Sequence, residues 1–88
     1  MQNRNFTIIN RLGLHARAAA QLVQTANKFS AEVTLLKDDI EVNGKSIMGI
    51  LLLAAPQGTE LEVTVEGVDE ENAMDVIAAL IEDGFGED

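Results

Sequence analysis

The chain has 88 residues, of which 47% are hydrophobic and 24% charged, which is the composition of one small globular domain spanning residues 1–88. It has no cysteine, no apolar leader at its start and no apolar run longer than residues 47–55. We therefore expect a cytoplasmic protein with no disulfide, no thiolate metal site and no membrane insertion. Its net charge of −9 argues against nucleic-acid binding, because neutralising phosphates requires clustered lysine and arginine side chains.

The first part of the chain predicts a strand followed by a helix. Residues 5–9 alternate as a strand with Phe6 and Ile8 directed inward. Gly13 then supplies a turn position. Residues 16–28 have helical spacing, and the many alanines on their inner face favour close packing against a sheet. The residues expected on that face are Ala16, Ala19, Ala20, Val23 and Ala26.

The middle of the chain predicts a hairpin and a short apolar helix. Strands over residues 32–36 and 40–42 are joined by a turn at residues 37–39. Ser46 is placed to cap a helix over residues 47–54.

The last part of the chain predicts one more strand and one more helix. Residues 60–66 alternate strictly between apolar and polar side chains, so one face of this strand is wet and acidic. Asp69 is expected to cap the last helix, and Gly84 is expected to end it with Phe85 folded back on the stop. The inner stripe of this helix is expected to comprise Ala73, Val76, Ile77, Leu80 and Ile81.

These elements follow the order β-α-β-β-α-β-α. The order predicts an α+β domain, a four-stranded, mainly antiparallel sheet with three helices on one face, in the manner of an open-faced sandwich. Such two-layer domains serve many unrelated activities, so the function has to be argued from individual residues.

His15, the only histidine, lies between the glycine-containing loop and the start of the first helix. Free N–H groups and the positive dipole at a helix start favour phosphate, and imidazole is a nucleophile that is largely neutral near pH 7. Arg17 adds a counter-charge for the same anion. Residues 1–31 carry four basic and no acidic residues, whereas residues 32–88 carry all fifteen acidic ones. We predict that the ring of His15 is transiently phosphorylated and passes the group on.

Other roles for His15 have less support. A histidine near a helix start is often a partly exposed side chain without a task. A metal site would have too few ligands, because the chain has one histidine, no cysteine and no carboxylate near His15 in sequence. Hydrolytic catalysis is not expected, because no second titratable group lies beside His15 to act as its partner.

The second candidate site is the segment around Ser46. An ordinary N-cap followed by a buried helix is one interpretation of this segment. The helix is apolar on every side, however, and two turns on a small domain rarely bury every face. Ile47, Met48 and Leu51 are therefore expected to form an exposed docking surface. A phosphate on Ser46 would lie at the positive end of the helix dipole, where it would change partner binding more than the fold.

Two segments resemble the HPr family, the histidine phosphocarriers of the bacterial phosphoenolpyruvate-dependent phosphotransferase system. Residues 12–17, Leu-Gly-Leu-His-Ala-Arg, are similar to the active-site segment of the family. Residues 43–49, Asn-Gly-Lys-Ser-Ile-Met-Gly, are similar to the segment around its regulatory serine. The lead-in at residues 9–13 and the acidic tail at residues 84–88 instead resemble the nitrogen-related paralogue, NPr. The resemblance covers essentially the whole chain and leaves open a sugar-uptake or a nitrogen-related pathway.

The resemblance implies a phosphoryl carrier that is not an enzyme and needs no cofactor. Enzyme I would phosphorylate His15 on Nδ1, Arg17 would assist the transfer, and a IIA-type protein would accept the group. In members regulated by an HPr kinase/phosphorylase, the serine that matches Ser46 is phosphorylated. We expect a monomer whose partner surface comprises Ala16, Ala20, Ile47, Met48 and Leu51.

One position departs from the family pattern. The family usually has His-Ala-Arg-Pro, whereas this chain has Ala18 in the fourth position. Proline in a first helical turn lacks only an N–H that has no intrahelical partner. We therefore expect transfer to persist, with an altered rate or a less rigidly placed Arg17.

Two other functions stay open from the sequence. The first is a regulatory interaction protein that is controlled through Ser46 and in which His15 is idle. The second is a ferredoxin-like domain that binds a small ligand, which fits the fold class but has no specific pocket residue in its support. A thermal-shift screen with candidate metabolites would test the second.

Overall fold

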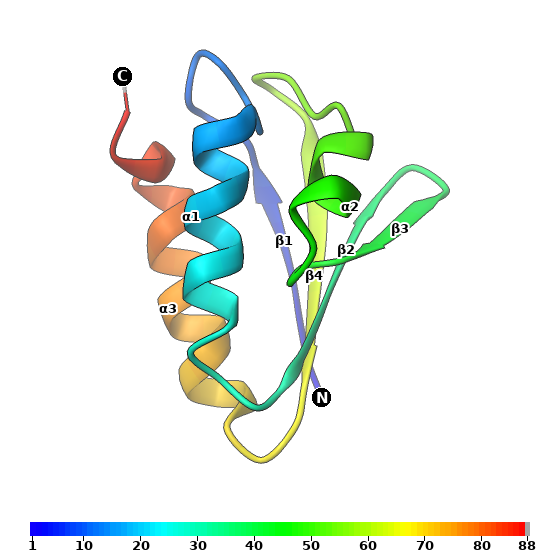
Figure 1. Cartoon of the computed structure of the whole chain (residues 1–88), viewed down its shortest axis with the longest axis vertical. Coiled ribbons are helices and arrows are strands. Elements are labelled where there is room, and N and C mark those ends of the chain that lie inside the picture. Colours follow the sequence, from blue (N-terminus) through cyan, green and yellow to red (C-terminus); the bar gives the residue numbers. More distant parts are fainter. Residues whose placement is uncertain (88) are drawn as a thin grey trace.

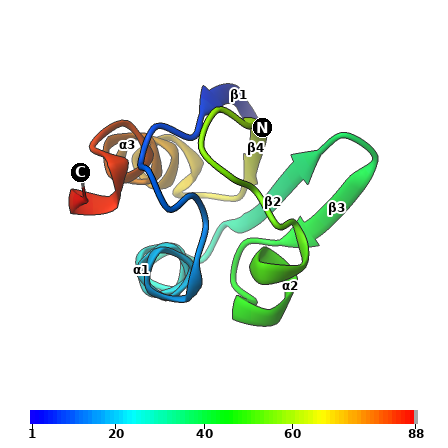
Figure 2. The same cartoon turned by 90° about the horizontal axis from the view of Figure 1, so that it is seen from above.

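The four strands of the computed structural model, which describes residues 1–87, form one antiparallel sheet in the order β1-β4-β2-β3. Three helices lie on one face of this sheet (Figures 1 and 2). The elements are β1 (Gln2–Thr7), α1 (Ala16–Ala26), β2 (Glu32–Lys37), β3 (Ile40–Asn43), α2 (Ile47–Leu52), β4 (Glu60–Glu66), α3 (Glu70–Glu82) and a 3-10 turn, η1 (Gly84–Gly86). The predicted α+β open-faced sandwich is confirmed.

Strand β4 lies in the interior of the sheet and shows why the two faces differ. Its side chains Leu61, Val63 and Val65 are fully buried beneath the helices, because successive residues of a strand point to opposite faces. On the other face Glu62 and Thr64 accept hydrogen bonds of 2.8 Å from the side chain of Asn3 on β1. The alternation predicted for residues 60–66 is therefore confirmed, and it places the core on the helix side.

The first strand begins and ends earlier than predicted. It covers Gln2–Thr7 rather than residues 5–9, because its pairing with β4 runs from Gln2 opposite Val65 to Thr7 opposite Glu60. Phe6 and Ile8 are both buried, as predicted, although Ile8 lies just beyond the strand.

The predicted inner face of α1 is confirmed at Ala19, Val23 and Ala26 and wrong at two other positions. Ala16 is exposed and Ala20 is only partly buried, whereas Ala18 and Leu22 are fully buried. Four alanines within residues 16–20 made the inner stripe ambiguous, since alanine fits either a core or a surface position. The buried residues of α1 are Ala18, Ala19, Leu22, Val23 and Ala26.

The stripe predicted for α3 is wrong at Val76, whereas Leu80 packs against the core. Val76 is 37% exposed and Leu80 only partly buried, whereas Met74 and Ala78 take the buried positions beside Ile77. The remaining predicted residues, Ala73, Ile77 and Ile81, are buried. None of the helices described over residues 1–87 has the length and apolar character that a membrane span requires.

Asp69 occupies the N-cap position of α3, but its side chain does not cap the helix. Its two carboxylate oxygens instead accept hydrogen bonds of 2.8 Å from the backbone N–H groups of Ser30 and Ala31. The carboxylate thus ties the loop before β2 to the start of α3. The bond from the Ser30 N–H, followed by that from Ala31, holds the pKa of Asp69 below its ordinary value.

This lowered pKa predicts how stability depends on pH. A carboxyl group whose pKa is depressed in the folded state stabilises the fold above its unfolded pKa, and this contribution is lost as the pH falls through the folded pKa. We expect Asp69→Asn to lower the urea midpoint at pH 7 and to reduce the further loss on acidification. Glu71→Gln on the same helix is the matched control, and equal effects of the two substitutions would contradict the prediction.

Candidate functional site

His15 is the N-cap residue of α1, with extended backbone angles, and its carbonyl accepts the first helical hydrogen bond, 2.8 Å long, from Ala19. The loop before it turns at Gly13, whose φ is +66°. The backbone N–H of Leu14 donates to the carbonyl of Ala55 at 2.9 Å, which fixes the loop against the segment between α2 and β4. The predicted position of His15 at the junction of a glycine-containing loop and a helix start is confirmed.

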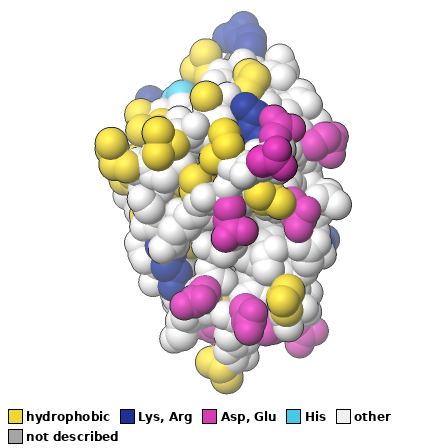
Figure 3. Space-filling view, turned by 90° about the vertical axis from the view of Figure 1, so that its right-hand side faces the viewer, with side chains coloured by type: hydrophobic (Ala, Val, Ile, Leu, Met, Phe, Trp, Pro, Cys, Tyr) yellow, Lys and Arg dark blue, Asp and Glu magenta, His cyan; other side chains and the backbone are white. Residues whose placement is uncertain are grey.

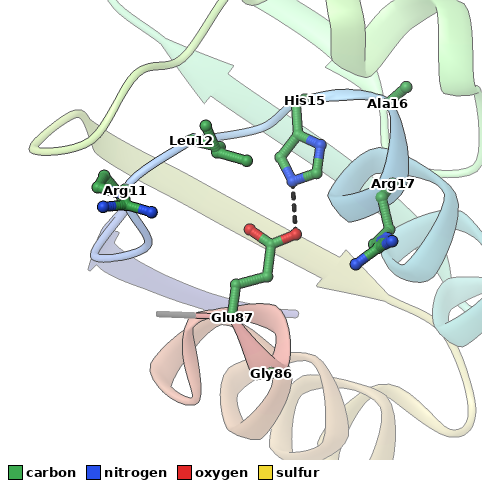
Figure 4. A pocket seen from close by; sticks show the side chains of 7 residues that line it. All are labelled: Arg11, Leu12, His15, Ala16, Arg17, Gly86 and Glu87. Atoms are coloured by element: carbon green, nitrogen blue, oxygen red, sulfur yellow. Dashed lines mark hydrogen bonds and ion pairs between the residues drawn. The ribbon is translucent and has the colours of Figure 1, made fainter.

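A carboxylate from the far end of the chain contacts the histidine ring. The side chain of Glu87 follows η1 and places Oε2 at 2.5 Å from Nε2 of His15 (Figure 4). Its second oxygen, Oε1, accepts a 2.9 Å hydrogen bond from Nδ2 of the buried Asn10, which also donates to the carbonyl of Gly13 at 2.8 Å. The expectation that no titratable group lies beside His15 is therefore wrong.

The charge of Glu87 is stabilised by its surroundings. The hydrogen bond from Asn10 makes the largest contribution to lowering the pKa of Glu87. The hydrogen bond and charge of His15 and the charge of Arg17 lower it further. Together they outweigh the effect of burial and hold the pKa of Glu87 below its ordinary value, so this side chain is ionised at neutral pH. No local pattern indicates this contact, because 72 residues separate Glu87 from His15.

An open hollow of about 630 Å³ surrounds the ring. Figure 4 shows Arg11 and Arg17 on opposite sides of His15, from the loop and from α1 respectively. These two guanidinium groups, together with the N–H groups at the start of α1, make the hollow suited to an anion. Its lining residues are Arg11, Leu12, His15, Ala16, Arg17, Gly86 and Glu87.

Helix α2 carries the second candidate site. The Oγ of Ser46 accepts a 3.1 Å hydrogen bond from the N–H of Gly49, which confirms the predicted N-cap. Ile50 is the fully buried side chain of this helix, whereas Met48 is 73% and Leu52 72% exposed. Ile47 and Leu51 are also exposed, as predicted. Leu12 and Leu52 enlarge the exposed apolar surface beyond the predicted residues.

This apolar surface lies at the end of the molecule that carries His15. Figure 3 shows hydrophobic side chains gathered near the histidine at the upper left of the view, with most of the acidic side chains to the right and below. A shallow recess lined by Leu12, His15, Ala54 and Pro56 joins the histidine to the segment after α2. Ser46 lies at the other end of α2, a six-residue helix that rises about 1.5 Å per residue, and does not line this recess.

Within residues 1–87 no three His, Cys, Asp or Glu side chains are grouped in a way that could hold a metal ion.

The model of the family described as "PTS HPr component phosphorylation site" matches residues 2–83. The chain belongs to this family. It is thus a phosphocarrier component of the phosphotransferase system. The phosphocarrier protein HPr of Xylella fastidiosa (strain Temecula1) is 51% identical over 88 residues, which are 100% of this chain and 99% of that protein. The phosphocarrier protein NPr of Proteus mirabilis is 41% identical, over 99% of this chain and 98% of that protein.

Solved HPr structures have the same architecture. HPr-C-His from Thermoanaerobacter tengcongensis superposes with a TM-score of 0.96 at 48% identity, over 100% of this chain and 99% of that one. An HPr dimer from the same organism superposes with a TM-score of 0.79 at 48% identity, over 99% of this chain and 100% of that one.

Ala18, which stands where the family usually has proline, is fully buried in the first turn of α1. Within residues 1–87 its backbone N–H meets no hydrogen-bond acceptor, so proline would break no bond there. We expect Ala18→Pro to raise the unfolding free energy by up to about 1 kcal/mol and to leave phosphorylation within a few-fold of the unsubstituted rate. A chain that takes phosphate only after this substitution would contradict the prediction.

The cap at Ser46 gives a prediction of stability. Ser46→Ala removes the acceptor for the Gly49 N–H and is expected to lower the unfolding free energy by about 1 kcal/mol. Ser46→Asp keeps an acceptor and is expected to retain that stability. Urea denaturation of both, with the exposed Ser30→Ala as the control, measures the difference. Equal losses in Ser46→Ala and Ser30→Ala would show that the cap contributes nothing.

Proposed function

We propose that His15 accepts a phosphoryl group from enzyme I, with phosphoenolpyruvate as the ultimate donor, and passes it to a IIA-type protein. The observation that carries this proposal is the placement of a part-buried imidazole in a hollow with Arg11 and Arg17, at the start of an eleven-residue helix. We place this transfer in the cytoplasm and assign it to a monomer.

The chemistry follows from the residues around the ring. A lone pair on a ring nitrogen attacks phosphorus while the bond to the donor breaks. The negative charge on the transferred group is balanced by Arg17 and by the N–H groups of the first helical turn. These groups are in place before the donor arrives, so little reorganisation is needed during the transfer.

The apolar surface supplies the docking site in this proposal. Ala16, Ile47, Met48 and Leu51 are exposed, and Ala20 is partly buried, beside an otherwise acidic body. A partner that covers this surface also covers the hollow, which keeps water from the phosphorylated ring. Exposed methionine adapts to more than one partner, as a carrier between a donor and an acceptor requires.

Incubation with enzyme I and labelled phosphoenolpyruvate tests the transfer. Acid-labile label is expected on the chain, none is expected on His15→Ala, and reduced labelling is expected for Arg17→Ala. Lys28→Ala, a basic residue beyond the other end of α1, is the matched control. If a competent enzyme I leaves the unsubstituted chain unlabelled, the proposal is wrong.

The same labelled protein distinguishes the two pathways. Purified IIA proteins of the sugar type and of the nitrogen-related type are offered in separate reactions. Loss of label to one and not to the other identifies the acceptor class.

We also propose that Ser46 is a regulatory phosphorylation site for an HPr kinase/phosphorylase. Its hydroxyl is part-exposed at the start of α2, and a phosphate there would add charge at the edge of the apolar surface. ATP-dependent, acid-stable label that disappears in Ser46→Ala is the expected result. Label on Ser46 with none on His15 would favour a regulatory protein over a carrier.

A further inference from the structure

The carboxylate of Glu87 is held against His15 by more than one restraint. Phe85, two residues earlier, is 2% exposed and anchors the end of the chain in the core. Gly84, Phe85 and Gly86 all have positive φ, which turns the backbone after α3. Asn10 then fixes one oxygen of Glu87, and the other oxygen faces the histidine ring. Glu87 also lies beyond residues 2–83, the part of the chain that the family model matches.

The amide of Asn10 can have only one orientation in this network. Its partners, the carbonyl of Gly13 and the carboxylate of Glu87, are both acceptors, so the side chain must present its NH₂ group to them. Asn10 therefore orients the carboxylate instead of competing with it for the ring.

The contact with Glu87 decides where the proton of His15 lies. An ionised carboxylate accepts hydrogen bonds and has none to donate, so Nε2 must carry the proton and donate it to Oε2. In the neutral ring the lone pair is then on Nδ1. Figure 4 shows this second nitrogen directed away from Glu87, on the side where Ala16 and the start of α1 lie.

We propose that Glu87 is a positioning residue that keeps the proton on Nε2 throughout the transfer, so that Nδ1 is the atom that accepts and releases phosphate. This inference rests on the proposed function of His15. When the group arrives, the Nδ1 lone pair forms the N–P bond, and the bond to the donor breaks with its electron pair left on the donor. The Nε2 proton stays in place, and the positive charge of the phosphorylated ring faces the carboxylate.

The release step reverses these changes. A lone pair of the acceptor attacks phosphorus, and the electron pair of the Nδ1–P bond returns to Nδ1. The leaving group is then a neutral imidazole that still carries its Nε2 proton, which is a better leaving group than an imidazolate anion. No proton has to be found or lost in either direction, which suits a carrier that exchanges partners.

Glu87→Gln tests this role, because glutamine keeps the shape but can donate as well as accept. In ¹⁵N NMR spectra of the unphosphorylated protein, we expect the unsubstituted chain to show a protonated Nε2 and an unprotonated Nδ1. Glu87→Gln is expected to show a mixture of the two tautomers. Both acceptance from enzyme I and loss of phosphate are expected to slow by about tenfold, in line with one charge-assisted hydrogen bond. Glu82→Gln, an exposed acid nearby, is the matched control.

The outcomes separate the two proposals. Unchanged ring-nitrogen signals and rates in Glu87→Gln would overturn the role of Glu87 while leaving His15 as the carrier. An unlabelled chain would overturn the proposed function, and the NMR spectrum would still show whether Glu87 fixes the proton. A slower rate with an unchanged tautomer would also overturn the inference, since it would indicate a merely structural effect of the tail.

Discussion

Gly13→Ala is expected to lower the unfolding free energy by about 2–5 kcal/mol and to abolish phosphorylation of His15. A Cβ on residue 13 would lie 2.4 Å from the carbonyl oxygen of Ala55 and 2.8 Å from Cα of Pro56. Both are backbone atoms, so neither can rotate away. The φ of +66° adds strain for any residue with a side chain. The displaced loop would lose the Leu14 to Ala55 hydrogen bond, which holds His15 at the start of α1.

Gly58→Ala separates the cost of backbone strain from the cost of the steric clash. Gly58 also has a positive φ, of +92°, but a Cβ there would meet no atom within 4 Å. It therefore reports backbone strain without a clash. Urea denaturation of both variants, together with the labelling reaction, measures the difference. A Gly13→Ala protein that is as stable as Gly58→Ala would show that the loop accommodates the clash.

Phe85→Ala is expected to lower the unfolding free energy by about 3–5 kcal/mol and to release Glu87 from His15. The ring is 2% exposed beneath the end of α3, and its removal leaves a cavity at the point where the tail turns. The unfolding free energy of a domain of this size is about 5–15 kcal/mol in total, so Phe85→Ala would remove a large share of it. Transfer by the surviving folded protein is expected to fall to the level of Glu87→Gln.

Two further substitutions sharpen this second test. Phe85→Leu keeps most of the apolar volume and is expected to lower the unfolding free energy by less than about 1.5 kcal/mol. The contact between Glu87 and His15 is expected to be retained. Val68→Ala, at a position that is 97% exposed, controls for a general effect of apolar truncation. If Phe85→Ala loses no more stability than Phe85→Leu, the ring does not anchor the tail.

Local pattern predicted the fold and half of the site. The alternation at residues 60–66, the cap at Ser46 and the stop at Gly84 each depend on neighbouring residues, and each is confirmed. The position of His15 at a helix start is of the same kind. Features that depend only on residues within one helical turn or one strand can thus be predicted from the sequence.

Two of the errors concern contacts between distant segments. Asp69 is of a residue type that is common at N-cap positions. Its carboxylate instead accepts hydrogen bonds from two N–H groups of the loop at Ser30, which only the tertiary fold brings within reach. Glu87 lies in an acidic tail, and no nearby residue in the sequence indicates what it contacts. In the structure it contacts His15, the central residue of the site. The face of α1 was ambiguous because its alanines fit inside or outside equally well.

The sheet order also limits when the chain can complete its fold. Strands β1 and β2 do not pair with each other, because β4 lies between them. Of the strand pairs described here, a chain emerging from the ribosome can thus form only β2–β3 before residue 60, and β1 waits for a partner that is made more than fifty residues later. The Glu87 contact with His15 waits longer still, until residue 87 has been made. A nascent chain, or one truncated before residue 87, would therefore display the histidine without the carboxylate, so a complete pocket marks a chain that has been made through residue 87.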